Sequence, residues 1–200
     1  STFDVRKPWP IIFVFDLKGR GKASVSMMVN AAEKEGYILA SSDNVNDSLS
    51  ISENVLITNR MFNALINIVP VANNRTYTAG FGSGAMFASI LPTFIKEIKG
   101  VVSIGASVGN IEILNSKQTF QFIGIVNRSD YSFRDMLDTQ QILNKMKFPN
   151  ELLVFDDDRI LPDVTTIASA FRMLTLTSMA KGDVQRNDSL ITDSYREFMT

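Results

Sequence analysis

Histidine and cysteine are both absent from the 200 residues of this chain. Without cysteine there is no disulfide framework, no thiolate nucleophile and no zinc site built on thiolates. Without histidine the chain lacks the commonest general base and the commonest metal ligand. A serine hydrolase triad needs an imidazole between its nucleophile and its acid, so the missing histidine weighs against triad catalysis.

An excess of charge of either sign is also lacking, because 20 basic and 21 acidic residues leave a net charge of −1. This balance predicts no nucleic-acid partner and no membrane-surface binding. No apolar run approaches the roughly 20 residues of a membrane-spanning helix, so no membrane span is expected. The chain is long enough for one domain with a sizeable core. It begins at Ser1 without Met, which suggests a processed chain or part of a longer protein.

Short apolar runs rich in β-formers alternate with amphipathic stretches. The apolar runs predict strands buried on both faces of a sheet, at Pro10–Leu17, Tyr37–Ser41, Arg75–Ala79, Gly100–Ala106, Thr119–Val126 and Glu151–Phe155. The stretches between them predict helices at Ala23–Glu35, Ile51–Val69, Ala85–Leu91, Phe133–Met146, Pro162–Ala180 and Ser189–Met199. This alternation predicts the α/β class: an open, mostly parallel sheet of about six strands with helices on both faces. We expect a single domain over residues 1–200, with its core at about 10–180 and a C-terminal helix at about 186–199.

Several local signals fix the predicted helix ends. Gly36 is expected to close the first helix, and Gly182 to break the chain after the long one. Ser50 and Glu53 have the spacing of a capping box for the second helix. That helix is expected to bury one stripe of side chains, formed by Val55, Phe62, Leu65, Ile66 and Val69. Pro70–Asn74 is interpreted as a turn.

The stretch 75–93 contains the most informative motif. A short strand enters a turn with glycine at positions 80, 82 and 84, and a helix of small residues leaves it. Strand, sharp turn and helix form the setting in which an α/β-hydrolase carries its nucleophile, in the pattern Gly-x-Ser-x-Gly. Here the central position holds Gly82, which has no side chain. Glycine adopts the strained backbone of such a turn without steric cost, so the turn can persist without a nucleophile.

With these elements placed, the chain resembles the α/β-hydrolases, in particular the small esterases and the feruloyl-esterase or depolymerase-like enzymes, from about Pro10 to Ala180. The family's oxyanion loop, nucleophile turn, following strand, acid loop and histidine loop are matched in that order by Phe15–Gly21, Asn74–Ala85, Gly100–Ser107, Asn127–Asp130 and Asp157–Pro162. The family's earliest strands have no counterpart before Pro10.

The departures from the family pattern all fall on its chemistry. The resemblance puts Gly82 in the nucleophile slot and Arg159 in the histidine slot, or Asp158 if the match shifts by one residue. Lys18 stands where the oxyanion loop has histidine, and only the acid slot, Asp130, keeps its type. Arginine stays protonated at any working pH and cannot act as a base. The resemblance therefore implies a hydrolase scaffold that has lost its triad.

The preferred hypothesis is a catalytically inactive hydrolase-like domain that binds a small-molecule or anionic ligand, or a protein partner, in the former active-site cleft. Its candidate binding residues follow the carboxyl ends of the strands, where ligands bind in open parallel sheets: Lys18, Arg20, Ser83, Asp130, Asp158 and Arg159. One alternative is an atypical esterase that uses Ser83 with a carboxylate as base, although Ser83 is more simply explained as a helix cap. Another is an interaction module whose C-terminal helix docks a neighbouring domain through Leu190, Ile191 and Phe198.

Three further motifs are weaker. Gly80–Ala85 fits a dinucleotide fingerprint, but the next strand ends at Ile104–Ser107 without the acidic residue that holds the ribose. A phosphate loop near Gly19–Ala23 fails because Asp16 and Ala23 occupy its glycine and hydroxyl positions. Asp156–Asp158 with Asp130 offers oxygen ligands for calcium, but we prefer a solvated acidic loop paired with Arg128 or Arg159. No metal and no cofactor are therefore expected.

Overall fold

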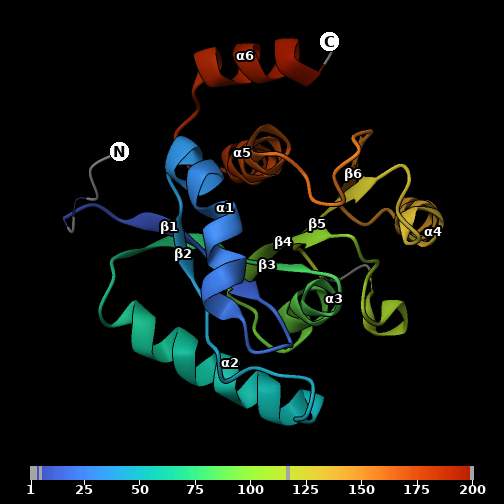
Figure 1. The fold of residues 1–200 in the computed structure, drawn as a ribbon. Coiled ribbons are helices and arrows are strands. Elements are labelled where there is room, and N and C mark those ends of the chain that lie inside the picture. The colour runs from blue at the N-terminus through green and yellow to red at the C-terminus, as the bar shows by residue number, and fades with distance from the viewer. Residues whose placement is uncertain (1–3, 5, 116–117, 199–200) are drawn as a thin grey trace.

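The chain folds around one parallel sheet (Figure 1). The computed structural model describes residues 4, 6–115 and 118–198. Within them the sheet has six strands in the order β2-β1-β3-β4-β5-β6, and every neighbouring pair is parallel. The strands are β1 (Trp9–Phe15), β2 (Ile38–Ala40), β3 (Val71–Phe81), β4 (Ile98–Ile104), β5 (Gln121–Asn127) and β6 (Asn150–Phe155). The predicted fold class is confirmed.

Helices cover both faces of the sheet, and each face has its own hydrophobic cluster. Helices α1 (Gly21–Glu35) and α5 (Val164–Ala180) pack on one face, in a cluster that includes Ile12 and Val14 of β1. Helices α2 (Ile51–Ile66), α3 (Ser83–Ile90) and α4 (Phe133–Lys145) pack on the other, in a cluster that includes Phe13 and Phe15 of β1. The apolar run of β1 is buried because alternate side chains enter different clusters.

The strand order places a topological switch point between β1 and β3. The chain passes from β1 outward to β2 on one side, and then returns to lay β3 on the other side of β1. The loops after β1 and β3 therefore diverge at the same edge of the sheet, where open α/β sheets bind their ligands. Those two loops carry the Asp16–Arg20 segment and the glycine turn.

Helix α6 (Asp188–Phe198) lies beyond α5, on the side away from the sheet (Figure 1). Arg172 of α5 donates a hydrogen bond to Glu35 of α1 at 2.7 Å and also pairs with Glu197 of α6. Leu190 and Ile191 are half-buried rather than exposed. The side chain of Phe198, the third residue of the predicted docking face, lies outside the described part of the chain. The described contacts thus attach α6 to its own domain.

The largest error in the predicted elements concerns Pro70–Asn74, which is not a simple turn. Strand β3 already pairs with β1 at Val71, bulges over the next four residues, and resumes its pairing at Thr76. Asn74 takes a positive φ of 57° inside the bulge. The turn-forming residues marked a real irregularity, but the sheet continues on both sides of it because β1 offers a partner before and after.

Two helix predictions also need correction. Helix α2 ends at Ile66 rather than Val69, and the Ile66 side chain, expected in the buried stripe, is 43% exposed. The fully buried positions of α2 are Asn54, Thr58 and Phe62, so its buried stripe includes polar residues that a hydrophobicity pattern passes over. Helix α3 begins at Ser83 rather than Ala85. The capping box of Ser50 and Glu53 and the helix ends at Gly36 and Gly182 are confirmed.

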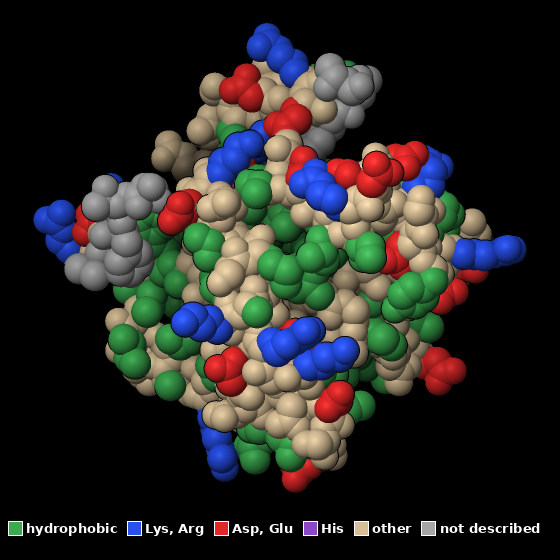
Figure 2. Space-filling model, viewed as in Figure 1, with side chains coloured by type: hydrophobic (Ala, Val, Ile, Leu, Met, Phe, Trp, Pro, Cys, Tyr) green, Lys and Arg blue, Asp and Glu red, His purple; other side chains and the backbone are tan. Residues whose placement is uncertain are grey.

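The surface shows no large region of one charge on the face seen in Figure 2, where basic, acidic and hydrophobic side chains lie interspersed. Within the described ranges, none of the helices has the length and apolar character needed to cross a bilayer.

Candidate functional site

The turn between β3 and α3 has Gly82 at its apex. Phe81 is the last residue of β3 and Ser83 the first of α3, so Gly82 alone connects strand to helix. Its backbone has φ +52° and ψ −120°, a conformation that L side chains rarely adopt. The Gly82 N–H donates to the carbonyl of Ile104 at the end of β4, at 2.9 Å. The residue that the sequence placed in the nucleophile slot thus occupies the tip of the turn.

The two flanking glycines are required by close packing. A Cβ on Gly84 would lie 2.2 Å from the carbonyl oxygen of Phe15, and a Cβ on Gly80 would lie 2.5 Å from the carbonyl carbon of Gly84. A Cβ on Gly82 meets nothing within 4 Å. The turn is therefore held by backbone contacts on either side of an open position.

The loop after β5 is organised by Asn127. This buried side chain donates from Nδ2 to the carbonyls of Asp157 and Arg159, at 2.7 and 2.8 Å, and so ties the loop after β6 to β5. Asp130, expected in the acid slot, accepts from the backbone N–H and the hydroxyl of Ser132, both at 2.7 Å. One oxygen of the Asp130 carboxylate is thus engaged at the start of α4.

Charge pairs occupy the loop after β6. Arg159 bonds Asp157 through Nη2 at 2.6 Å, and this hydrogen bond lowers the pKa of Asp157 and raises the pKa of Arg159. Asp156 pairs with Arg128 at 3.7 Å. These are the pairings preferred over a calcium site, and among the described residues no group of three acidic side chains is arranged to hold a metal ion.

A cavity of about 260 Å³ lies between the loops after β5 and β6. Its lining includes Asp130, Asp158 and Arg159, so the structure brings together these three predicted residues. Arg159 reaches it with its charge already paired to Asp157, and Asp158 is exposed.

The side chain of Asp16 holds the loop after β1 together. This mostly buried carboxylate accepts from the Lys18 backbone N–H at 2.8 Å and pairs with the Arg20 guanidinium at 2.8 Å. Arg20 is therefore not a free anion-binding charge. Lys18 forms a backbone bridge to Asn46 and is exposed. Neither residue lines the cavity between the β5 and β6 loops.

Ser83 faces a different cavity, of about 300 Å³, between α2, α3 and the loop before α2. Its walls are mostly apolar, formed by Leu17, Leu49, Ile51, Met86, Phe87 and Ile90. We call it the α2–α3 cavity. The expected capping role of Ser83 is wrong, because the N-cap of α3 is Gly82 and Ser83 is already helical. Neither Asp130 nor Arg159 lines this cavity, so Ser83 is separated from both.

The known proteins most informative for this geometry are solved hydrolases. No protein-family model and no curated protein sequence matches the chain. An acetyl ester-xyloside bifunctional hydrolase from Caldicellulosiruptor lactoaceticus matches at a TM-score of 0.68 and 14% identity, over 91% of this chain and 86% of that one. Est1E from Butyrivibrio proteoclasticus matches at 0.64 and 10%, over 86% and 89%. S-formylglutathione hydrolase from Staphylococcus aureus matches at 0.61 and 14%, over 85% and 81%.

The chain has an α/β-hydrolase-like fold. At these identities the likeness establishes the fold alone and says nothing about which side chains are reactive. Within this hydrolase-like fold, Gly82 forms the apex of the turn between β3 and α3, and Asp130 and Arg159, the residues expected in the acid and histidine slots, border one cavity. Sequence reasoning gave no role to three polar residues that shape the site. Asn127 was placed in the acid-loop match, but not as the residue that ties this loop to the one after β6. Asp47 and Asn54 lie in a loop and on a helix with no motif to mark them.

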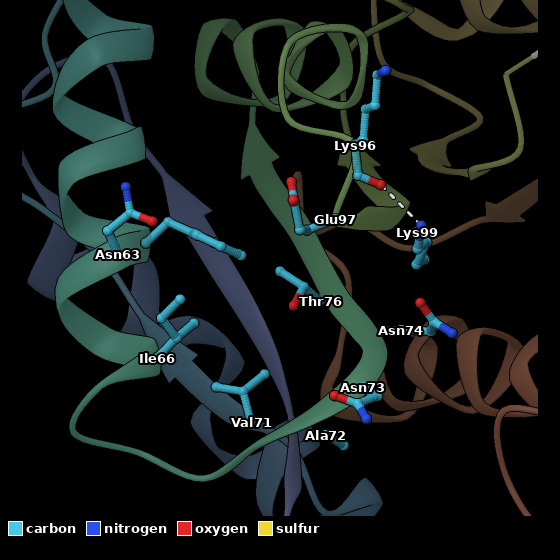
Figure 3. Close-up of a pocket in the computed structure, with 11 residues that line it drawn as sticks. Asn63, Ile66, Val71, Ala72, Asn73, Asn74, Thr76, Lys96, Glu97 and Lys99 are labelled. Carbon is cyan, nitrogen blue, oxygen red and sulfur yellow. Dashed lines mark hydrogen bonds between the residues drawn. The ribbon is translucent and has the colours of Figure 1, made fainter.

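A larger cavity, of about 760 Å³, lies at the opposite edge of the sheet (Figure 3). Asn63 and Ile66 of α2 form one wall of the cavity, and Thr76 of β3 and Glu97 lie across from them. On its far side the Lys99 ammonium donates to the carbonyl of Lys96 at 2.9 Å. This cavity adjoins the bulge in β3 and the beginning of β4, away from the glycine turn, so it is not part of the candidate site.

Proposed function

We propose that this protein is a catalytically inactive hydrolase-like domain that binds a ligand at the carboxyl edge of its sheet. The observation that carries the proposal is the apex of the nucleophile turn. Gly82 stands there with φ +52° and ψ −120°, in front of open space. An attacking oxygen would project from this position, and glycine supplies none.

The lack of a base supports the same proposal. The chain contains no histidine. Arg159, in the histidine slot, bonds Asp157, and this raises the pKa of a group that is always protonated in proteins. It can neither take a proton from a hydroxyl nor return one to a leaving group. The triad positions therefore offer a carboxylate and a fixed cation, without nucleophile or base.

The competing function is an esterase that uses Ser83. It has one observation in its favour, because Ser83 lines the α2–α3 cavity together with the carboxylate of Asp47. Against it, a carboxylate is a much weaker base toward a serine hydroxyl than the imidazole of a serine hydrolase. Ser83 also lies one residue beyond the apex, so its side chain points from the helix and not from the tip of the turn.

Ester turnover and active-site labelling separate the two functions. Purified protein should hydrolyse p-nitrophenyl acetate no faster than the buffer does, and an alkyl fluorophosphonate probe should leave no adduct detectable by intact mass. The Ser83→Ala variant is the matched control, because any hydrolysis or label carried by Ser83 disappears in it. Turnover that Ser83→Ala abolishes, or a stoichiometric adduct on Ser83, would overturn the proposal in favour of the esterase.

A further inference from the structure

The α2–α3 cavity has an apolar floor and a polar rim. Phe87 and Ile90 are buried at its base, while Met86 and Ile51 are exposed at its mouth. Ser83 and Asp47 are both exposed and contribute a hydroxyl and a carboxylate. A site with this gradient matches a molecule that buries an apolar body and keeps one polar group at the surface.

Hydrogen bonds hold the walls of the cavity in place. Asn54 of α2 is buried, accepts from the Asn46 N–H at 3.1 Å, and donates to the Asn46 carbonyl at 2.8 Å. On the other side the Asp47 N–H donates to the Leu17 carbonyl at 2.7 Å. The loop before α2 is thus fastened both to α2 and to the loop after β1. A ligand entering the cavity would order little of the chain, which favours binding.

The volume sets the size of the ligand. An apolar protein cavity of about 150 Å³ accommodates benzene. The α2–α3 cavity, at about 300 Å³, has room for a body of two fused rings.

The charge at the rim sets the ligand's head group. Asp47 is the one charged residue among the described residues that line the cavity. A carboxylate head would face it without compensation, while an ammonium head can pair with it and a hydroxyl can donate to it. The N-terminus of α3 also lies at Ser83 and carries only about half a positive charge, which does not offset a full negative one. Asp47 therefore favours a cation.

We propose that the α2–α3 cavity binds a compact aromatic or aliphatic amine, with its apolar body on Phe87 and Ile90 and its ammonium at Asp47. The inference rests on the proposed function, which it deepens by naming the ligand class and its place. The cavity is separate from the triad slots, since Gly82, Asp130 and Arg159 are not among its lining residues.

Three probes that share a naphthalene body test the head-group preference by isothermal titration. 2-(1-Naphthyl)ethylamine should bind with a dissociation constant on the order of 0.1 mM, a modest efficiency for a ligand of its size. 2-(1-Naphthyl)ethanol should bind about threefold more weakly and 1-naphthaleneacetate about tenfold more weakly, because only the amine gains from the rim charge. In Asp47→Asn the amine and the acetate should bind within about twofold of each other, because the rim charge is gone. The alcohol should change little, because its hydroxyl can donate to the amide oxygen as it does to the carboxylate.

Blocking variants test the location. Leu49→Trp, in the loop before α2, should fill the cavity and reduce amine binding at least tenfold. Leu56→Trp, at an exposed position of α2 that does not line the cavity, should leave binding unchanged. Met86→Trp at the mouth is a second blocking variant, used if Leu49→Trp lowers the unfolding midpoint. The inference is overturned if the amine does not bind at 1 mM, if the acetate binds tighter than the amine, or if both blocking variants bind like Leu56→Trp.

Failure of this inference is distinguishable from failure of the proposed function. The probes contain no ester, so their binding does not depend on turnover. If the protein hydrolyses p-nitrophenyl acetate, Ser83→Ala abolishes this activity and the amine still binds, the proposed inactivity is refuted and the proposed ligand site is kept. If there is neither amine binding nor ester turnover, the proposed ligand site is refuted and the proposed inactivity is kept.

Discussion

The nucleophile turn and the loop after β6 lie at the same sheet edge and are held by different means. At the turn, backbone packs on backbone, and Gly84 lies so close to Phe15 that no Cβ fits between them. In the loop, side chains do the fastening, with Asn127 and Arg159 bonding the backbone or carboxylate of the segment. The turn can therefore keep the geometry of a hydrolase whatever stands at its apex. In the loop, a substitution at Arg159 or Asn127 would change both the polar groups that border the cavity and the bonds that hold the segment.

The largest expected effect comes from crowding the turn. Gly84→Ala places a Cβ 2.2 Å from the Phe15 carbonyl oxygen, and neither backbone segment can move without disturbing the sheet. We expect a loss of about 3 kcal/mol or more in the free energy of unfolding, measured by urea titration. Gly182→Ala is the control, since it has a positive φ but open space around it, and should lose about 1 kcal/mol. Equal losses in the two variants would mean that packing does not hold the turn.

The loop should respond to loss of its buried amide far more than to loss of its charge pair. Asn127→Ala leaves the carbonyls of Asp157 and Arg159 without their donor, and we expect a loss of about 2 kcal/mol in the same titration. Arg159→Gln removes an exposed pair that solvent screens, so it should leave the free energy of unfolding unchanged within the error of the titration. A reversed ranking would assign the fastening of the loop to the ion pair.

The apex itself should accept a side chain at the cost of backbone strain alone. Gly82→Ser has space for its Cβ but a φ of +52°, so we expect a loss of about 1–2 kcal/mol. Gly182→Ser, with a φ of +81° and equally open surroundings, should lose a similar amount. Because the chain has no histidine, Gly82→Ser should not hydrolyse p-nitrophenyl acetate faster than the parent protein. Hydrolysis by the variant would reveal a base near the apex other than an imidazole.

The smallest effect concerns the junction of the β6 loop with α5. Asp163 caps α5, and the hydrogen bond from the Thr166 N–H lowers its pKa from the ordinary value of 3.8. Its stabilisation is present above that value and is lost as pH falls through the lower folded pKa. At pH 7 Asp163→Ala should lose about 1 kcal/mol and Asp163→Asn much less. The difference between parent and Asp163→Ala should be constant from pH 7 to 5 and shrink below about pH 4; a difference that grows on acidification would contradict the sign.

The sequence predicted the sheet because its signals are local. The apolar run of β1, the capping box before α2 and the glycine after α1 each act within one turn or one strand. The site was harder to predict from the sequence, because hydrogen bonds that shape it join residues far apart in the chain. Asn127 donates a hydrogen bond to the loop after β6, some 30 residues later in the chain. Asp16 forms an ion pair with Arg20, the residue expected from the sequence to bind an anion. Ser83 and Asp130 were assigned to one cleft, but the divergence of the loops gives each its own cavity.

The open space in front of Gly82 can be used for site-specific labelling, because the chain contains no cysteine. Replacing this glycine with cysteine would create one unique attachment point, at the start of a helix, where a sulfur ionises more readily than in water. A fluorescent dye attached there would lie at the carboxyl edge of the sheet, and its emission would report a ligand that binds nearby. No other residue of the chain would carry the label.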